Sequence, residues 1–95
     1  MSTTVGLVHL NLDVAQAMSL KDKRRIVKGF KDRIRNRHNV SVSEVDAHEN
    51  HRSAVLAFAM VSNDRKYAEG VLQKIINAAA SHRDMVLIDH EIQWL

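Results

Sequence analysis

The segment Ser53–Ser62, SAVLAFAMVS, is apolar on both sides of an extended chain. Successive side chains of a strand point to opposite faces, so Leu56 and Phe58 share one face. Val55 and Ala57 share the other. A strand that is apolar on both faces is typical of the middle of a sheet. We therefore expect residues 53–62 to form a central strand.

The segments on either side predict the order βαββαβ. Apolar and polar residues alternate over residues 5–14, which indicates a first strand. Residues 40–45 alternate too, with a phase slip near Glu44 and Val45 that predicts a bulge. Apolar residues recur at helical spacing in two segments, 20–37 and 67–79, and the helices begin at Ser19 and at Asn63 or Asp64 as N-caps. A last strand is expected over 85–95, with Val86, Ile88, Ile92 and Trp94 in phase and His90 at a buried position.

This order predicts an α+β, ferredoxin-like sandwich, in which a four-stranded antiparallel sheet carries both helices on one face. The 95 residues suit one domain, 1–95. The helix side would take Leu10, Leu12, Leu56 and Phe58. The opposite face would show Val5, Leu7, Val55, Ala57, Ala59 and Val61, a modest apolar patch that suits a homodimer or a partly apolar solvated sheet.

Composition excludes several classes of protein. There is no cysteine, so disulfide frameworks, thiolate zinc sites and cysteine nucleophiles are excluded. No apolar run is long enough to span a bilayer. The start MSTTVGLVHLNLDV lacks the basic residues and the continuous apolar block of a secretory signal, so we expect a cytoplasmic protein without membrane association.

Positive charge is concentrated in SLKDKRRIVKGFKDRIRNR, residues 19–37. This segment holds nine of the fourteen basic residues and only two acidic ones, Asp22 and Asp32, for a local charge of +7. Since the whole chain has a net charge of +3, the remainder carries −4. A chain that is basic on one element and acidic elsewhere indicates a directed electrostatic surface.

On a helix, five of these basic residues form one stripe beside the apolar face, which we call the basic ridge. Their spacing of 3, 4, 3 and 4 residues extends the ridge over about 21 Å at ~1.5 Å per residue. Arg25 widens the ridge, Arg33 and Arg37 lie on the other flank, and Lys23 lies over the apolar face, where its stem would have to snorkel. The ridge consists of Lys21, Arg24, Lys28, Lys31 and Arg35.

A row of Lys and Arg suits phosphate-backbone binding, and RNA or ribosomal RNA fits it. Solvated helix faces usually interleave both signs in i,i+4 pairs, whereas repulsion along this ridge looks uncompensated within the helix. Base stacking on the sheet is not expected, because the chain has only four aromatic residues, Phe30, Phe58, Tyr67 and Trp94, and Phe58 reads as core. An acidic protein surface or solvent would satisfy the same ridge.

Other candidate sites are weaker. The DAHENH segment, 46–51, holds metal-capable side chains at a hairpin, but its spacing matches no helical zinc motif, so we expect no metal and no cofactor. The loop VAQAM after the first strand lacks the glycine or arginine of a phosphate-binding loop. Asp13 and Asp89 could approach one another on adjacent strands, yet a lone carboxylate pair is weak evidence for acid–base chemistry. We therefore expect no catalytic residues and a protein that is not an enzyme.

Three motifs together resemble the YlxP-like family of small bacterial proteins, described as a domain of unknown function. They are SLKDKR at 19–24, NVSV at 39–42 and VSND at 61–64, within a resemblance that covers essentially the whole chain. Asp22 stands where many relatives are expected to have glutamate. The resemblance implies the ferredoxin-like fold and a genomic setting among translation and ribosome-maturation factors, but no established reaction.

The sequence thus favours a non-enzymatic, RNA- or ribosome-associated protein that acts in ribosome maturation or translation. Its contacts to the phosphate backbone would come from Lys21, Arg24, Arg25, Lys28, Lys31 and Arg35. The alternative is a dimeric regulatory or scaffold module that associates through its sheet face. In that case the basic helix would face an acidic protein partner or solvent.

Overall fold

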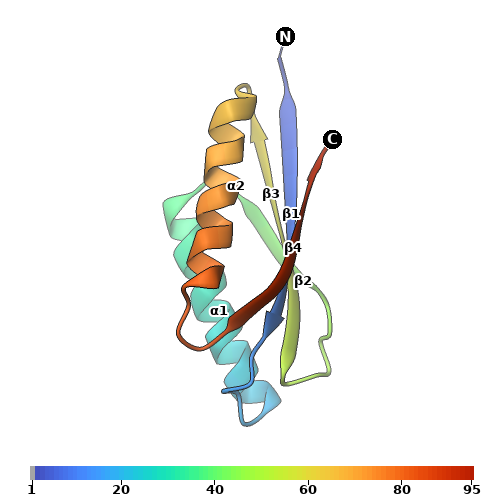
Figure 1. Cartoon of the computed structure of the whole chain (residues 1–95), viewed down its shortest axis with the longest axis vertical. Helices are drawn as coiled ribbons and strands as arrows, with labels where there is room; N and C mark the ends of the chain where they lie inside the picture. The colour runs from blue at the N-terminus through green and yellow to red at the C-terminus, as the bar shows by residue number, and fades with distance from the viewer. Residues whose placement is uncertain (1) are drawn as a thin grey trace.

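A four-stranded antiparallel sheet with two helices on one face forms the whole structure (Figure 1). The computed structural model describes residues 2–95. Its elements follow the predicted order: β1 (Thr4–Asp13), α1 (Leu20–Arg37), β2 (Ser41–Asp46), β3 (Ser53–Ser62), α2 (Arg65–Ala80) and β4 (Val86–Trp94). Neither helix is long and apolar enough to cross a membrane within this part of the chain.

The strand order β2-β3-β1-β4 places β3 and β1 in the centre, as the two-sided apolarity of β3 predicts. β1 and β3 pair without interruption from Thr4 opposite Ser62 to Asp13 opposite Ser53. The shorter β2 and the bulged β4 form the two edges. The ferredoxin-like fold is confirmed.

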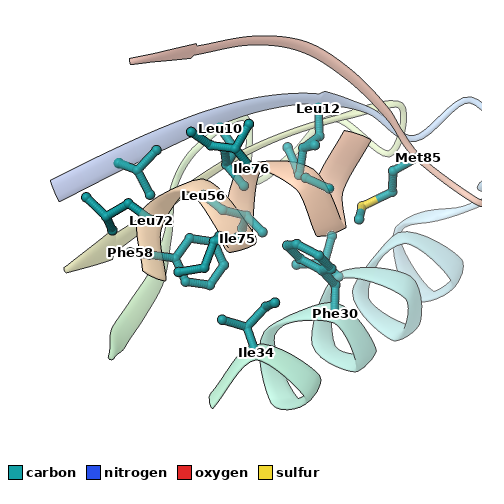
Figure 2. Packing of buried hydrophobic residues seen from close by; sticks show 14 of the residues in the cluster. Leu10, Leu12, Phe30, Ile34, Leu56, Phe58, Leu72, Ile75, Ile76 and Met85 are labelled. Carbon is teal, nitrogen blue, oxygen red and sulfur yellow. The ribbon is translucent and has the colours of Figure 1, made fainter. Parts of the chain in front are cut away.

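The core lies between the helices and the sheet (Figure 2). Leu10 and Leu56 supply its sheet side and are fully buried, as expected. Phe30 of α1 meets Phe58 of β3 edge-to-face at a centroid distance of 6.0 Å, a geometry that adds about 0.5–1.5 kcal/mol to the burial of area. The helix layer is therefore fixed to the two central strands.

Both helices begin at capping residues. The hydroxyl of Ser19 accepts a hydrogen bond from the Asp22 N–H at 3.1 Å, and the carboxylate of Asp64 accepts one from the Tyr67 N–H at 3.1 Å. The Asp22 carboxylate accepts in turn from the N–H of Met18 at 3.0 Å, one residue before the cap. Each cap satisfies a backbone donor that the helix itself leaves unpaired.

Each edge strand carries a bulge. The predicted bulge in β2 is present, because Glu44 pairs with Leu56 and Asp46 with Val55, which leaves Val45 as the extra residue. A second bulge in β4 was not foreseen: Leu12 pairs with Leu87 and Asn11 with Asp89, so that Ile88 is the extra residue.

The β4 bulge overturns the predicted phase of this strand. Leu87 packs against the core, whereas Val86 and Ile88 are 59% and 58% exposed. Beyond the bulge the phase is the predicted one, and Ile92 and Trp94 pack against the core. His90 shares their parity but lies exposed on the edge strand, so its predicted burial is wrong.

Tyr67 also departs from the prediction, because it is 59% exposed instead of completing the apolar arc of α2. It lies in the first turn of α2, which extends beyond the end of α1 (Figure 1). The turn therefore has no helix beside it to cover a bulky side chain. Ala68 and Leu72, which point toward the sheet, are fully buried.

Candidate nucleic-acid interface on the first helix

The basic ridge lies on the solvent side of α1. Lys28 and Arg35 have side chains that are 75% and 49% exposed, and Lys21 and Arg24 are also exposed. Lys31 is half-buried. Ile26, Val27, Phe30 and Ile34 of the same helix are buried against the core. The predicted separation of an apolar inner face from a basic outer face is therefore present.

The charge on this surface is partly neutralised within the helix, contrary to our expectation. Asp32 lies between two ridge residues and contacts both, at 2.6 Å from the Lys28 ammonium and 2.6 Å from the Arg35 guanidinium. Asp22 pairs with Arg25 at 3.1 Å. Each pair is three or four residues apart, the spacing at which side chains of a helix meet.

These contacts stabilise the charged form of both aspartates. Hydrogen bonds from Lys28 and then Arg35 lower the pKa of Asp32. For Asp22, the backbone N–H of Met18 lowers the pKa most, followed by the side chain of Arg25. Both carboxylates therefore stay ionised at neutral pH and offset part of the helix charge.

Three ridge residues, Lys21, Arg24 and Lys31, form no ion pair with any group of residues 2–95. They lie on one helix face, since Arg24 follows Lys21 by three residues, about one turn, and Lys31 follows Arg24 by seven, about two turns. These three cations are thus available to an external anion without first breaking an internal contact.

Lys23 is not a surface residue. Its side chain is only 1% exposed, so the expectation that its charged end would snorkel to solvent is wrong. Its ammonium donates to the carbonyl oxygens of Ala47 at 2.8 Å, Asn50 at 2.8 Å and Ser53 at 3.0 Å. Eight basic residues of α1 therefore remain for the surface, against two acidic ones.

The Lys23 ammonium also lies 2.8 Å from the Glu44 carboxylate, whose contacting oxygen Oε2 is buried and makes no directed hydrogen bond. The ammonium thus has four oxygen neighbours, three neutral carbonyls and one charged carboxylate. Two of the carbonyls, those of Ala47 and Asn50, belong to the turn between β2 and β3, where Ala47 adopts a left-handed φ of 64°. Lys23 thus fastens that turn to the first turn of α1.

A second group of basic side chains lies on the opposite flank of α1. Arg33 lines a hollow of about 310 Å³ with Ser81, His82, Arg83 and Asp84, where α2 ends. The His82 ring packs edge-to-face on Phe30 at 5.7 Å, and its Nδ1 accepts from the Asp84 N–H at 3.0 Å. Burial and then the charge of Arg33 lower the pKa of His82.

His38, at the end of α1, lies near basic side chains of both helices. Its pKa is lowered by burial first and then by the charges of Lys74 and Arg37. Lys74 comes from α2, so positive charge from both helices meets at this point. Both histidines are therefore held in the neutral form near pH 7, and the positive charge here is that of the lysines and arginines.

The other sequence candidates do not assemble into a site. Residues 46–51 line an open hollow at the hairpin turn. No three His, Asp or Glu side chains lie close enough to share a metal ion in the part of the chain that the structure describes. Asp13 pairs with Val86 and Asp89 with Asn11, so these two carboxylates lie on adjacent strands but not opposite one another.

Three comparisons place the chain among known proteins. The family described as "Protein of unknown function (DUF503)" matches residues 5–92. The "Uncharacterized protein YlxP" of Bacillus subtilis (strain 168) is 31% identical over 72 residues, which are 76% of this chain and 78% of that protein.

A solved structure described as "De novo designed protein Foldit4" has a TM-score of 0.57 and 14% identity, and the match covers 99% of this chain and 97% of that one. At that identity the likeness concerns the fold alone. The match over residues 5–92 and the similarity to YlxP instead concern ancestry. The chain belongs to the DUF503 family of proteins of unknown function.

Proposed function

We propose that this protein binds structured RNA, on the ribosome or its precursors, through the outer face of α1 and performs no catalysis. The observation that carries the proposal is the set of unpaired cations Lys21, Arg24 and Lys31, along one exposed helix face. Rows of this kind neutralise phosphates and release counterions, which gives salt-dependent affinity. Lys28 and Arg35 would add contacts, and Arg25 would assist.

Contacts to the RNA backbone fit this surface better than recognition of bases. Phe30 and Phe58 are buried, and the Trp94 ring is covered by the Arg65 guanidinium at 3.9 Å. Within residues 2–95 the outer face of the sheet therefore offers no aromatic platform for bases. The protein would read the shape and phosphate spacing of a folded RNA.

The support beneath the basic ridge favours a defined binding geometry. Lys23 fixes the first turn of α1 to the β2–β3 turn, and Phe30 fixes the middle of the helix to β3. Side chains on a rigid helix lose less freedom on binding than side chains on a loop. The translational setting that the YlxP-like resemblance implies favours the ribosome as the source of the RNA.

The test is binding of the purified protein to ribosomal RNA and to ribosomal subunits over a series of salt concentrations. The variant Arg24→Gln/Lys31→Gln removes two unpaired cations without touching Asp32 or Asp22. We expect weaker binding and a salt slope reduced by about 1 for each lost contact. Affinity should fall by at least about tenfold at low salt.

The matched control is Lys66→Gln/Lys74→Gln on α2, which removes the same charge from exposed positions of the other helix. It should retain most of the affinity and nearly the whole salt slope. Equal losses in both variants would mean that only net charge matters. An unchanged slope in the α1 variant, or no RNA binding by the unmodified protein, would contradict the proposal.

A further inference from the structure

The face of the sheet opposite the helices is uncovered, and we call it the outer sheet face. Strand pairing fixes which residues lie side by side on it. Leu7 lies between Ala59 and Gln93, and His9 lies between Ala57 and Glu91. Following these pairs along the strands divides the face into two ends of different chemistry.

One end is apolar. Val5 pairs with Val61, which is 68% exposed, and the N–H of Leu95 donates to the carbonyl of Val5 at 2.9 Å. Leu95 is 79% exposed and has the same strand parity as Gln93, which places it on this face. With Leu7 and Ala59 in the next row, this end is a contiguous apolar surface.

The other end is acidic. Asp89 pairs with Asn11, and Asp46 pairs with Val55, so both carboxylates share a face with Glu91 and Asp13. None of these four carboxylates forms an ion pair with any group of residues 2–95. The nearby Arg52 lines a hollow with Asp13 but pairs with none of them either.

This division argues against a second copy as the occupant of the whole face. Two outer sheet faces laid together in full would bring eight carboxylates into one interface, twice the four that each copy carries. Buried like charges without partners cost several kcal/mol. An overlap of the apolar ends alone would involve Val5, Leu7, Ala59, Val61 and Leu95 of each copy, whereas a stable interface takes about 20–30 residues a side. The same negative charge argues against RNA as the ligand of the outer sheet face.

The geometry points to a helical segment of another protein, apolar in one half of its length and cationic in the other, as the ligand of the outer sheet face. Its apolar residues would cover Val5, Val61 and Leu95, and its lysines or arginines would lie over Asp89 and Glu91. The face runs from Val5 to Asp13, about 27 Å at ~3.4 Å per residue. A helix of about 18 residues matches that length.

Such a ligand would leave the basic ridge free, because the ridge lies on the helix layer and this face lies on the other side of the sheet. The chain would then join a basic protein segment to an RNA. The inference rests on the sheet alone and does not require that the RNA proposal be correct. A charge-complementary contact of this type forms quickly and weakens with salt.

The test follows the amide chemical shifts of the protein while a synthetic helical peptide is added, with leucine and valine in one half and lysine in the other. We expect shift changes on β1, β3 and β4 of the outer sheet face. The variant Asp89→Asn/Glu91→Gln should bind about threefold to tenfold more weakly. Val61→Ser/Leu95→Ser should also weaken binding, and both positions are exposed enough to tolerate the change.

The matched control is Glu69→Gln/Asp84→Asn, which removes the same charge from the helix side and should bind like the unmodified protein. Shift changes confined to the helices would overturn the inference. So would equal weakening in the control, or no effect of Val61→Ser/Leu95→Ser, since charge alone would then hold the peptide. A stable dimer whose formation perturbs the outer sheet face would assign that face to a second copy and overturn it too.

Discussion

The inner and outer sides of α1 use the same kind of side chain in opposite ways. On the inner side, Lys23 is surrounded by three carbonyl oxygens and one carboxylate and is 1% exposed. On the outer side, Lys28 is 75% exposed and contacts one carboxylate. Lys21 and Arg24 contact none among residues 2–95.

The difference teaches that the role of a cation on this helix depends on how many of its donors the protein itself satisfies. Lys23 already donates to three carbonyl oxygens, and its loss would leave the buried Oε2 of Glu44 without its cation. The outer cations have hydrogen-bond donors that no protein group uses, so a change of partner should affect stability little. Stability should therefore depend on the inner side, and binding on the outer side.

The largest expected effect is that of Lys23→Met. The variant keeps the length of the side chain but leaves three carbonyls and the Glu44 carboxylate without their cation. The free energy of unfolding should therefore fall by about 3–5 kcal/mol. Urea unfolding would measure this change. Because small domains have only about 5–15 kcal/mol of stability, the variant should lie close to the threshold of folding.

The control for that prediction is Lys21→Met, two residues earlier on the exposed side, which should change stability by less than about 0.5 kcal/mol. The double variant Lys23→Met/Glu44→Gln should recover part of the loss by removing the unpaired carboxylate. A loss of the same size in Lys21→Met, or none in Lys23→Met, would break the contrast between the two sides.

A smaller effect, on binding, is expected of Asp32→Asn. This change removes the anion that holds Lys28 and Arg35, so both cations become available to phosphate. RNA affinity should rise by about threefold to tenfold and the salt slope should steepen. A fall in affinity would mean that Asp32 orders these two side chains for binding instead of competing with the RNA.

The smallest effect concerns pH. Burial and then Arg33 lower the pKa of His82 below its usual 6.5, so the unfolded chain binds the proton more readily. His82 therefore stabilises the fold above about pH 6.5, and this contribution is lost as the pH falls through the lowered pKa. As the pH is lowered from about 7.5 to 5, the midpoint of unfolding should decrease less steeply in His82→Phe than in the unmodified protein.

The variant His90→Asn, at an exposed histidine on the edge strand, should follow the unmodified protein over the same range. His38 also has a lowered pKa, so part of the decrease should persist in His82→Phe. An identical pH dependence in all three proteins would show that His82 does not contribute. This result would leave the inner side of α1 dependent on Lys23 and the apolar contacts alone.

The fold could be predicted because its main features are periodic. The two-sided apolarity of residues 53–62 indicates the centre of the sheet, and the buried set Ile26, Phe30 and Ile34 repeats at helical spacing. The cap at Ser19 could be recognised from residue type, whereas residue type left Asn63 and Asp64 open for α2, which Asp64 caps. These signals are local, so they can be recognised without knowledge of the tertiary contacts.

What the sequence did not reveal depends on contacts between distant residues. The bulge at Ile88 depends on how β4 pairs with β1. Because of it, Leu87 faces the core and Ile88 faces solvent. Lys23 is buried because the β2–β3 turn presents carbonyls to it across more than twenty residues of sequence. Its position at the centre of the apolar arc was the available sign that its ammonium would meet an internal partner.

The Asp32 contacts are a different case, because they could have been predicted from the sequence. Residues 28, 32 and 35 stand at i,i+4 and i,i+3 spacing, the separations that bring side chains together on a helix. The net charge of the segment does not show this pairing, because it does not depend on which side chains are in contact. The basic outer face of α1 was thus predicted, but its unpaired cations are fewer than the basic residues of the segment. Its role as an interface stays a prediction.

The bulges at Val45 and Ile88 have one more consequence, for how the protein behaves at high concentration. Both interrupt the outermost strands, β2 and β4, where unpaired N–H and C=O groups could recruit another chain and seed fibrils. An extra residue twists the strand and breaks the even repeat that edge-to-edge growth requires. Copies crowded together are thereby hindered from polymerising through their backbones.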